Sequence, residues 1–290
     1  MIHKKTWSTP VIGEERRTVP CALCGGGQFI PSLSCEHFSY VQCTVCGLVQ
    51  MNPQPLTAEV ERRYREWHGD DYLAYQLRNE AIFFDLQKRA LADANFDLLE
   101  QNLMKRMDRP PAVLDAGCAT GAMLAFLKDR GWQVTGVEIS PSAEYAQKER
   151  ELDIRRQSLE DCHFSSESFD LVLASHLIEH LNNPGTFIAE AWRVLRPGAC
   201  LMVTTPNIDG FQARLFGSRW RSAIFDHLYL FSKRTLTATL TSQGFITEGV
   251  FTWGGLAAGT APLPLKQFAD KAAKALGLGD VMLVKARKKN

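Results

Sequence analysis

Residues 176–180 read His-Leu-Ile-Glu-His, and their polar side chains could bind a metal ion. The pattern H-x-x-E-H is the spacing of one class of zinc proteases. On a helix, positions i, i+3 and i+4 lie on one face, so His176, Glu179 and His180 would point the same way. A protease would also need a more distant ligand and a supporting helix, but Asn182-Asn183-Pro184 ends this segment at once. The sequence therefore disfavours a zinc protease.

Four cysteines near the N-terminus form a second set of possible ligands. They occur as C-x2-C, an interval of eighteen residues and a second C-x2-C, with glycine after each pair: Cys21, Cys24, Cys43 and Cys46. Four thiolates make a closed tetrahedral zinc site with no position for a substrate, so we predict a structural zinc ion. Cys35 and His37 lie in the interval, and whether either touches the metal stays open.

A glycine-containing turn follows an apolar strand at VLDAGCATG, residues 113–121. Gly117 allows close approach of a ligand to the backbone, and the start of the following helix favours negative charge. The dinucleotide fingerprint G-x-G-x-x-G is not met, because Ala119 and Ala122 occupy its second and third glycine positions. A nicotinamide cofactor is therefore disfavoured. Glu138 ends the next strand, where an acidic side chain can hold both hydroxyls of a ribose.

Strands and helices alternate after Pro111. We expect strands at 112–116, 132–138, 169–175, 200–207, 245–253 and 280–288, and helices at 121–131, 140–151, 184–195 and 232–244. Ser140 and Ser232 are candidate N-caps. This alternation predicts an α/β fold with a mainly parallel sheet covered by helices on both faces.

The remaining segments suggest how the chain is divided. Residues 21–55 are too few to bury a core alone, 56–105 show helical periodicity, and 206–231 form a long aromatic-rich connection typical of a binding lid. We predict a tail at 1–20, a zinc-ribbon module at 21–55, a helical lid or linker at 56–105, and a catalytic α/β domain at 106–290 with a substrate lid at 206–231.

Composition excludes several classes of partner. The net charge is +1, so no global basic field attracts nucleic acid, and Cys21 to Cys46 contains no Lys or Arg. Apolar runs are shorter than the roughly 18 residues of a membrane span, and the N-terminus lacks the apolar stretch of a secretory signal. We expect a cytoplasmic protein that binds neither nucleic acid nor membrane.

Four motifs in order resemble the class I S-adenosylmethionine-dependent methyltransferases: VLDAGCATG, VTGVEIS, SFDLVLASHLIEHL and VLRPGACLMVTTPN. The resemblance covers about residues 110–290 and implies a Rossmann-like, seven-stranded sheet with an antiparallel final strand. The cysteine module and the stretch HLYLFS are similar to those of ubiquinone-type and natural-product methyltransferases that carry an N-terminal zinc ribbon. The implied cofactors are S-adenosyl-L-methionine and a structural zinc ion.

The resemblance also implies a set of cofactor contacts. Asp115, Gly117, Cys118 and Gly121 would surround the methionine part, and Glu138 would bind the ribose. Ile139 would lie against the adenine. The remaining contacts would come from Leu159, Glu160 and Asp161 in a loop over the adenine and from Ser175.

We expect methyl transfer to a small, partly apolar acceptor, with O-methylation favoured. A histidine base would help if the acceptor is a hydroxyl or an enol, and the candidates are His176, His180 and His227. The rivals are C- or N-methylation of a sugar or other natural-product intermediate, modification of a nucleic acid or protein, and cofactor binding without catalysis. The acceptor, the methylated atom, the base and the oligomeric state stay open.

Overall fold

The structure is a computed structural model that describes residues 15–66, 69–255 and 262–289. The predicted tail, residues 1–20, lies outside the described residues as far as residue 14. In the described part, β1 (Arg16–Arg17) pairs with β5 (Gln54–Pro55). Within these ranges, no helix is both long and apolar enough to cross a membrane.

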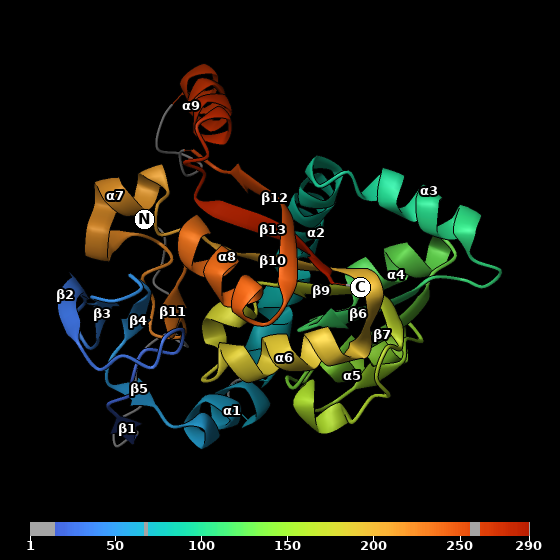
Figure 1. The fold of residues 1–290 in the computed structure, drawn as a ribbon, viewed down its shortest axis with the longest axis horizontal. Helices are drawn as coiled ribbons and strands as arrows, with labels where there is room; N and C mark the ends of the chain where they lie inside the picture. Colours follow the sequence, from blue (N-terminus) through green and yellow to red (C-terminus); the bar gives the residue numbers. More distant parts are fainter. Residues whose placement is uncertain (1–14, 67–68, 256–261, 290) are drawn as a thin grey trace.

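A seven-stranded sheet forms the centre of the molecule (Figure 1). Its order is β12-β13-β10-β9-β6-β7-β8, and β13 runs antiparallel to both of its neighbours. The strands are β6 (Ala112–Ala116), β7 (Gln133–Val137), β8 (Ile154–Arg155), β9 (Phe169–Ser175), β10 (Leu195–Pro206), β12 (Phe245–Trp253) and β13 (Val281–Lys288). The predicted α/β class and the antiparallel final strand are confirmed. The sequence did not locate β8, which is too short to show a periodicity.

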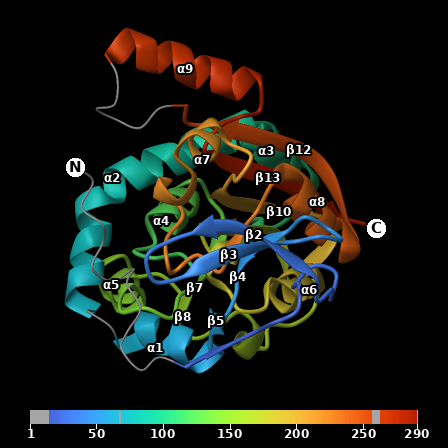
Figure 2. The ribbon, with the colours of Figure 1, turned by 90° about the vertical axis from the view of Figure 1, so that its left-hand side faces the viewer.

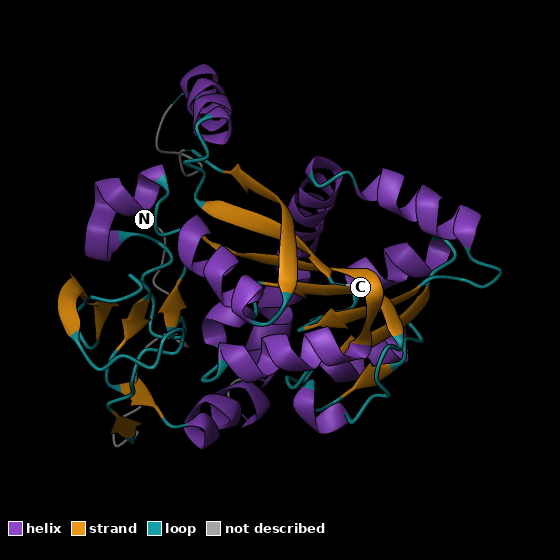
Figure 3. Cartoon of the chain, in the orientation of Figure 1, coloured by secondary structure: helices purple, strands orange, loops and turns teal. Residues whose placement is uncertain are grey.

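The sheet has one apolar layer on each face because successive side chains of a strand point to opposite sides. Leu114, Val172 and Val203 pack on one face with α6 (Pro184–Val194) and α8 (Lys233–Ser242). Val113, Leu171 and Met202 pack on the other face. The helices there are α2 (Gly69–Asp93), α3 (Phe96–Arg106), α4 (Ala122–Asp129) and α5 (Ser142–Glu149). Figure 3 shows the helices on both sides of the strands, as predicted.

The helix starts follow local capping chemistry. Ser232 caps α8 as predicted, in a capping box with Thr235. α5 begins at Ser142, so its N-cap position falls on Pro141, and the predicted cap, Ser140, lies one residue before it. The hydroxyl of Ser140 still accepts a hydrogen bond from the backbone N–H of Ser142 at 3.3 Å.

The cysteine module forms a separate four-stranded sheet of order β11-β4-β3-β2. Its strands are β2 (Phe29–Ser34), β3 (Ser39–Cys43), β4 (Val49–Met51) and β11 (Tyr229–Leu230). β11 comes from the predicted lid, so the module and the lid share one sheet, which lies in front of the large sheet in Figure 2. The apolar side chains of the module belong to the same core as α6 and α8.

The segments around the two sheets are helical. The predicted helical segment 56–105 contains α1 (Thr57–Glu66), α2 and α3. In the lid and near the C-terminus, α7 (Phe211–Phe216) and α9 (Leu263–Ala275) were not predicted. Figure 1 shows α9 at the top, apart from the body of the molecule. Single turns of 3₁₀ helix are η2 (Glu160–Cys162), η3 (Ile178–His180) and η4 (Gly217–Arg219).

Candidate active site

The turn after β6 and the acid after β7 are joined directly by hydrogen bonds. The carboxylate of Glu138 accepts the backbone N–H of Ala119 at 3.0 Å and that of Ser140 at 2.8 Å. The N–H of Gly117 donates to the carbonyl of Val137 at 2.7 Å. We call residues 115–140, at the carboxyl ends of β6 and β7, the glycine-turn edge. Ligands of open α/β sheets bind at such an edge.

Two positions in this turn require glycine. Gly117 and Gly121 have φ angles of +73° and +76°, which disfavour side chains. A Cβ atom at Gly121 would lie 2.6 Å from a methyl carbon of Leu152, so this side chain would have to shift to admit a larger residue. A Cβ at Gly117 would meet Leu177 at 3.3 Å, which places the start of the His-Leu-Ile-Glu-His segment against the turn.

Asp115 and Cys118 are buried in the glycine-turn edge. Burial and the charge of Glu138 raise the pKa of Asp115 to about 8, so its carboxyl group is mostly protonated at neutral pH. Burial raises the pKa of the Cys118 thiol well above its usual range. The thiol is therefore not a nucleophile, because only the thiolate reacts readily.

Helix α2 crosses the glycine-turn edge, and Figure 2 shows it along one side of the molecule between α1 and α3. Glu80 on α2 accepts hydrogen bonds from the Thr120 hydroxyl and from Arg150. Farther along, α2 covers a cavity that includes Asp115 and Ser175. Its lining is Gln87, Ala90, Leu91, Asp115, Met123, Leu173, Ala174, Ser175, Met202, Thr204 and Leu283. Two predicted cofactor contacts, from β6 and β9, thus meet in one cavity.

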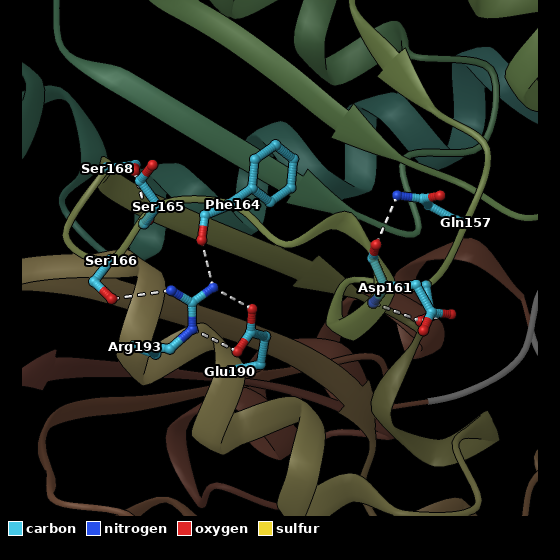
Figure 4. Close-up of polar contacts among 9 residues, drawn as sticks. Gln157, Asp161, Phe164, Ser165, Ser166, Ser168, Glu190 and Arg193 are labelled. Carbon is cyan, nitrogen blue, oxygen red and sulfur yellow. Dashed lines mark hydrogen bonds and ion pairs between the residues drawn. The ribbon is translucent and has the colours of Figure 1, made fainter.

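The predicted adenine loop is anchored at both ends (Figure 4). At one end, Asp161 is exposed, its carboxylate accepts the Ser158 hydroxyl at 2.7 Å, and its carbonyl accepts the Gln157 amide at 2.9 Å. At the other end, Arg193 donates to the Phe164 carbonyl at 2.5 Å and pairs with Glu190. The predicted contacts differ in burial: Leu159 is buried, Ile139 and Glu160 are half-buried, and burial raises the pKa of Glu160.

The His-Leu-Ile-Glu-His segment does not form the helical face that a zinc protease requires. His176 has a φ of +52° and lies before η3, and its side chain is 48% exposed. Glu179 is fully buried and accepts from His176 Nδ1 at 3.0 Å and from the Thr205 hydroxyl at 2.9 Å. Burial alone would raise the pKa of Glu179, but the His176 hydrogen bond and the neighbouring imidazoles lower it to about 2. Glu179 is therefore an ionised carboxylate.

His180 and His227 lie against each other, with ring centroids 4.7 Å apart. His180 Nδ1 lies 2.9 Å from the Asp226 carbonyl and 2.8 Å from the Tyr64 hydroxyl. His227 Nδ1 donates to the Ser222 carbonyl at 2.8 Å. Burial and His180 lower the pKa of His227 to about 3, so this imidazole is neutral.

Comparison with known proteins identifies the family. A family model described as a methyltransferase domain matches residues 85–248, more than half of the chain. The chain belongs to this methyltransferase family. The predicted family is thereby confirmed, and the match begins inside α2.

Named relatives of this methyltransferase agree with the family match. One is a probable S-adenosylmethionine-dependent methyltransferase of Mycolicibacterium smegmatis, 32% identical over 50% of this chain and 57% of that protein. Another is the mitochondrial ubiquinone biosynthesis O-methyltransferase of Rattus norvegicus, 34% identical over 33% of this chain and 30% of that protein. The matched stretch spans about half or less of these relatives.

A solved structure shares the fold. The crystal structure of a SAM-dependent methyltransferase from Archaeoglobus fulgidus has a TM-score of 0.51 at 17% identity. It covers 74% of this chain and 99% of that chain.

The glycine-turn edge of the methyltransferase fits S-adenosylmethionine. Glu138 is held by two backbone N–H groups, and its oxygens keep lone pairs that hydroxyl groups can share. Asp115 contributes a buried acid to the cavity under α2, where a cationic group would favour its ionised form. This donor set suits a ribose and the positively charged methionine part of the cofactor.

The four cysteines of the methyltransferase lie within 4.8 Å of one another. Cys21 Sγ is 3.3 Å from Cys46 Sγ, and Cys24 Sγ is 3.5 Å from Cys43 Sγ. A tetrahedral zinc ion with Zn–S distances of about 2.3 Å requires sulfurs about 3.8 Å apart. Gly25 and Gly47 follow the two cysteine pairs. Their φ angles are +71° and +78°, so each pair is followed by a turn of the same left-handed kind. The residues fit zinc, and Cys35 and His37 are outside the group.

Sequence reasoning missed the residues that fix the lid. The Tyr40 hydroxyl donates to the carbonyls of Ile224 at 2.7 Å and His227 at 2.8 Å. Arg63 forms a buried ion pair of 2.6 Å with Asp226. We call Tyr40, Arg63, Tyr64, Asp226 and His227 the ribbon–lid junction. Only the aromatic richness of 206–231 pointed to it, because its partners are far apart in the sequence.

Proposed function

We propose that this protein transfers a methyl group from S-adenosylmethionine to a hydroxyl of a small, partly apolar molecule. The observation that carries the proposal is the hydrogen bond between His176 Nδ1 and the buried carboxylate of Glu179. A histidine oriented by a carboxylate is a suitable proton acceptor. The mitochondrial ubiquinone biosynthesis enzyme among the relatives is named as an O-methyltransferase, which agrees with an oxygen acceptor.

The three candidate histidines differ in what their surroundings allow. His176 is 48% exposed and follows Ser175, which lines the cavity under α2, so we infer that its second nitrogen, Nε2, can reach an acceptor there. His227 is buried, and its pKa of about 3 makes it a poor proton acceptor. His180 is held by Asp226 and Tyr64. We therefore assign the base to His176.

The chain's own residues would bind the cofactor, orient the acceptor and take the proton from its hydroxyl. When bound, S-adenosylmethionine supplies a methyl group whose carbon–sulfur bond breaks with its electron pair on sulfur as the acceptor oxygen bonds to carbon. Glu138 holds the ribose, and helix α2 excludes water over Asp115. His176 Nε2 takes the hydroxyl proton, and Glu179 stabilises the resulting imidazolium. Alignment of the reacting groups can account for roughly 7–11 kcal/mol of the barrier.

We also propose that Cys21, Cys24, Cys43 and Cys46 hold a structural zinc ion. A closed four-thiolate site leaves no position for the acceptor. The knuckle turns at Gly25 and Gly47 and the short sulfur–sulfur distances support this assignment. Its role would be to hold the module against the lid.

The test is calorimetric titration with S-adenosylmethionine and S-adenosylhomocysteine, with NADH as the control, followed by a screen of hydroxyl, amine and activated-carbon acceptors. We expect binding of the two sulfur nucleotides alone and transfer to hydroxyl acceptors. Tight binding of NADH would contradict the cofactor, and transfer only to amines or carbon would contradict O-methylation.

A variant of His176 tests its assignment as the base. His176→Gln should lower kcat by roughly 10²- to 10⁴-fold with little change in cofactor affinity. It should also remove the acid limb of the pH–rate profile. The matched control is His37→Gln, because His37 is exposed in the cysteine module and lies outside the cysteine group. An unchanged pH–rate profile in His176→Gln would refute the base.

A further inference from the structure

We propose that α9 forms the interface of a dimer, in which it packs antiparallel against the α9 of a second copy of this chain. The helix lies between β12 and β13, and Figure 2 shows it across the top of the molecule. The proposal goes beyond methyl transfer and does not depend on the acceptor or the base.

Helix α9 presents its apolar face to the outside. Leu265 and Phe268 are 55% and 70% exposed. The opposite face attaches the helix to the body, because Ala273 is buried and the Asp270 carboxylate accepts the backbone N–H of Gly255 at 2.7 Å. An amphipathic helix that only covers its own protein turns its apolar side inward. The outward apolar side of α9 therefore fits a second surface.

The outward face has a large half and a small half. Four apolar residues recur at intervals of three and four and so form one line along the helix: Leu265, Phe268, Ala272 and Ala275. The two large side chains come first along the chain. In an antiparallel pair, Phe268 faces the partner's Ala272, and Leu265 faces the partner's Ala275. A twofold axis repeats each contact, so every large side chain meets a small one.

The charges of α9 favour a second copy over a lipid surface. Lys266 forms an ion pair with Asp270 on the same helix. Lys274 pairs with Asp93 of α2 at 2.7 Å. Both lysines are thereby neutralised, whereas a helix that lies on an anionic membrane needs a cationic polar face. Lys271 is exposed but lies off the apolar line, so pairing of two helices would bury no unpaired charge.

Helix α7 enlarges the apolar face at one end of α9. The backbone N–H of Phe211 donates to the Leu278 carbonyl at 2.9 Å, so α7 begins beside the end of α9. Phe211, Leu215 and Phe216 of α7 are exposed, as is Leu276 directly after α9. In the antiparallel arrangement the start of the partner's α9 lies at this end. The exposed large side chains of both helices together approach the roughly 800 Å² per partner of a standard interface, so we expect a dimer of moderate affinity.

The experiment is sedimentation of the full-length protein at concentrations from about 1 to 100 µM. We expect the wild type to dimerise in this range and Phe268→Asp to raise the dissociation constant of the dimer roughly 30-fold or more. The matched control is Leu98→Asp, because Leu98 on α3 is 60% exposed and lies outside α7 and α9. Circular dichroism should show both variants folded, since both side chains are in solvent in the single chain.

Two outcomes of sedimentation would overturn the proposal. One is a wild type that stays monomeric at the highest concentration, and the other is an equal dissociation constant in the wild type and Phe268→Asp. A monomer that binds phosphatidylglycerol vesicles through Phe268 would also overturn it and assign the face to a membrane.

An exchange of a large and a small residue tests the antiparallel arrangement. Phe268→Ala removes the large side chain, and Ala272→Phe places two phenylalanines opposite each other, so each change alone should weaken the dimer. The double variant Phe268→Ala/Ala272→Phe again sets a large side chain against a small one, and its dissociation constant should return to near the wild-type value. Losses that simply add in the double variant would overturn the antiparallel pairing.

Discussion

The glycine-turn edge and the ribbon–lid junction differ in how far apart their partners lie in the sequence. In the glycine-turn edge, Ala119 and Glu138 are 19 residues apart. In the junction, Tyr40 and His227 are 187 residues apart, and Arg63 and Asp226 are 163 apart. The first region is one strand–turn–helix–strand unit, whereas the second exists only when the whole chain has folded.

The difference separates two tasks. The local unit carries the residues that fit the cofactor, whereas the long-range junction holds residues 224–227 against the cysteine module and α1. Changes in the junction should therefore alter stability and the lid while the cofactor affinity stays the same. Changes at Glu138 should lower the cofactor affinity while the junction and its cysteine module stay folded.

Cys24→Ser should have the largest effect. Loss of one thiolate removes the zinc ion, which contributes on the order of 10 kcal/mol to ordering a module of this kind. One equivalent of zinc should be lost, and hydrogen exchange in residues 222–230 should rise, while S-adenosylmethionine still binds. Metal analysis, hydrogen exchange and calorimetry check these outcomes. Cys35→Ser is the control, because Cys35 is outside the cysteine group. Loss of cofactor binding in Cys24→Ser would show that the two regions fold as one.

Glu138→Gln tests the glycine-turn edge. Hydrogen bonds to a charged group contribute about 1.5–3 kcal/mol, so affinity for S-adenosylmethionine should fall roughly 10- to 150-fold. The free energy of unfolding should also fall by about 1–3 kcal/mol, because the amide oxygen can accept only one of the two backbone N–H groups and the other loses its acceptor. Glu144→Gln, on the exposed pair with Lys148, is the control for calorimetry. Unchanged affinity would remove Glu138 from the ribose site.

Tyr40→Phe should destabilise the junction alone. The carbonyls of Ile224 and His227 would lose a buried donor, which costs about 1–3 kcal/mol in the free energy of unfolding. Urea denaturation measures this change, and cofactor affinity should be unaltered. Tyr145→Phe is the control, since its ring lies under the Arg150 guanidinium and outside the junction. An equal decrease of the free energy of unfolding in both variants would argue against a specific role for Tyr40.

The smallest expected effect is a proton released on cofactor binding. Burial and Glu138 raise the pKa of Asp115 to about 8, so Asp115 is protonated in the free protein at pH 6.5. A cationic ligand beside it favours the ionised form, so binding should release up to one proton and affinity should rise with pH. Calorimetry in buffers of different ionisation enthalpy measures the release. Asp115→Asn should release no proton on cofactor binding. Proton uptake by the wild type would contradict the placement of Asp115 beside the cationic part of the cofactor.

The two regions also differ in what the sequence could predict. β6, the glycine turn and β7 follow one another, so their apolar runs and spacing were enough to locate them. β8 and β11 have two residues each, and a pairing that short leaves no periodic signal. The left-handed backbone of His176 depends on its contact with β10, where its N–H donates to the Thr204 carbonyl at 2.8 Å. No local pattern predicts that conformation.

The predicted site residues illustrate the same limit. Asp115 and Ser175 come from two different motifs that were expected to meet at the cofactor, and they do share a cavity. The spacing of His176 and His180 suggested a common face, but only the folded chain shows that His180 contacts His227 and that His176 contacts Glu179. Tyr40, Arg63 and Tyr64 were unremarkable in the sequence, since their partners lie in other segments.

The pairing of β11 with β4 has a consequence for synthesis on the ribosome. The strand that completes the small N-terminal sheet emerges about 180 residues after β4. At elongation rates of about 5–20 residues per second, this interval lasts roughly 10–35 s. During that time the edge of β4 has no partner strand, although both cysteine pairs are already outside. Early capture of zinc would keep this part of the nascent chain compact until its last strand arrives.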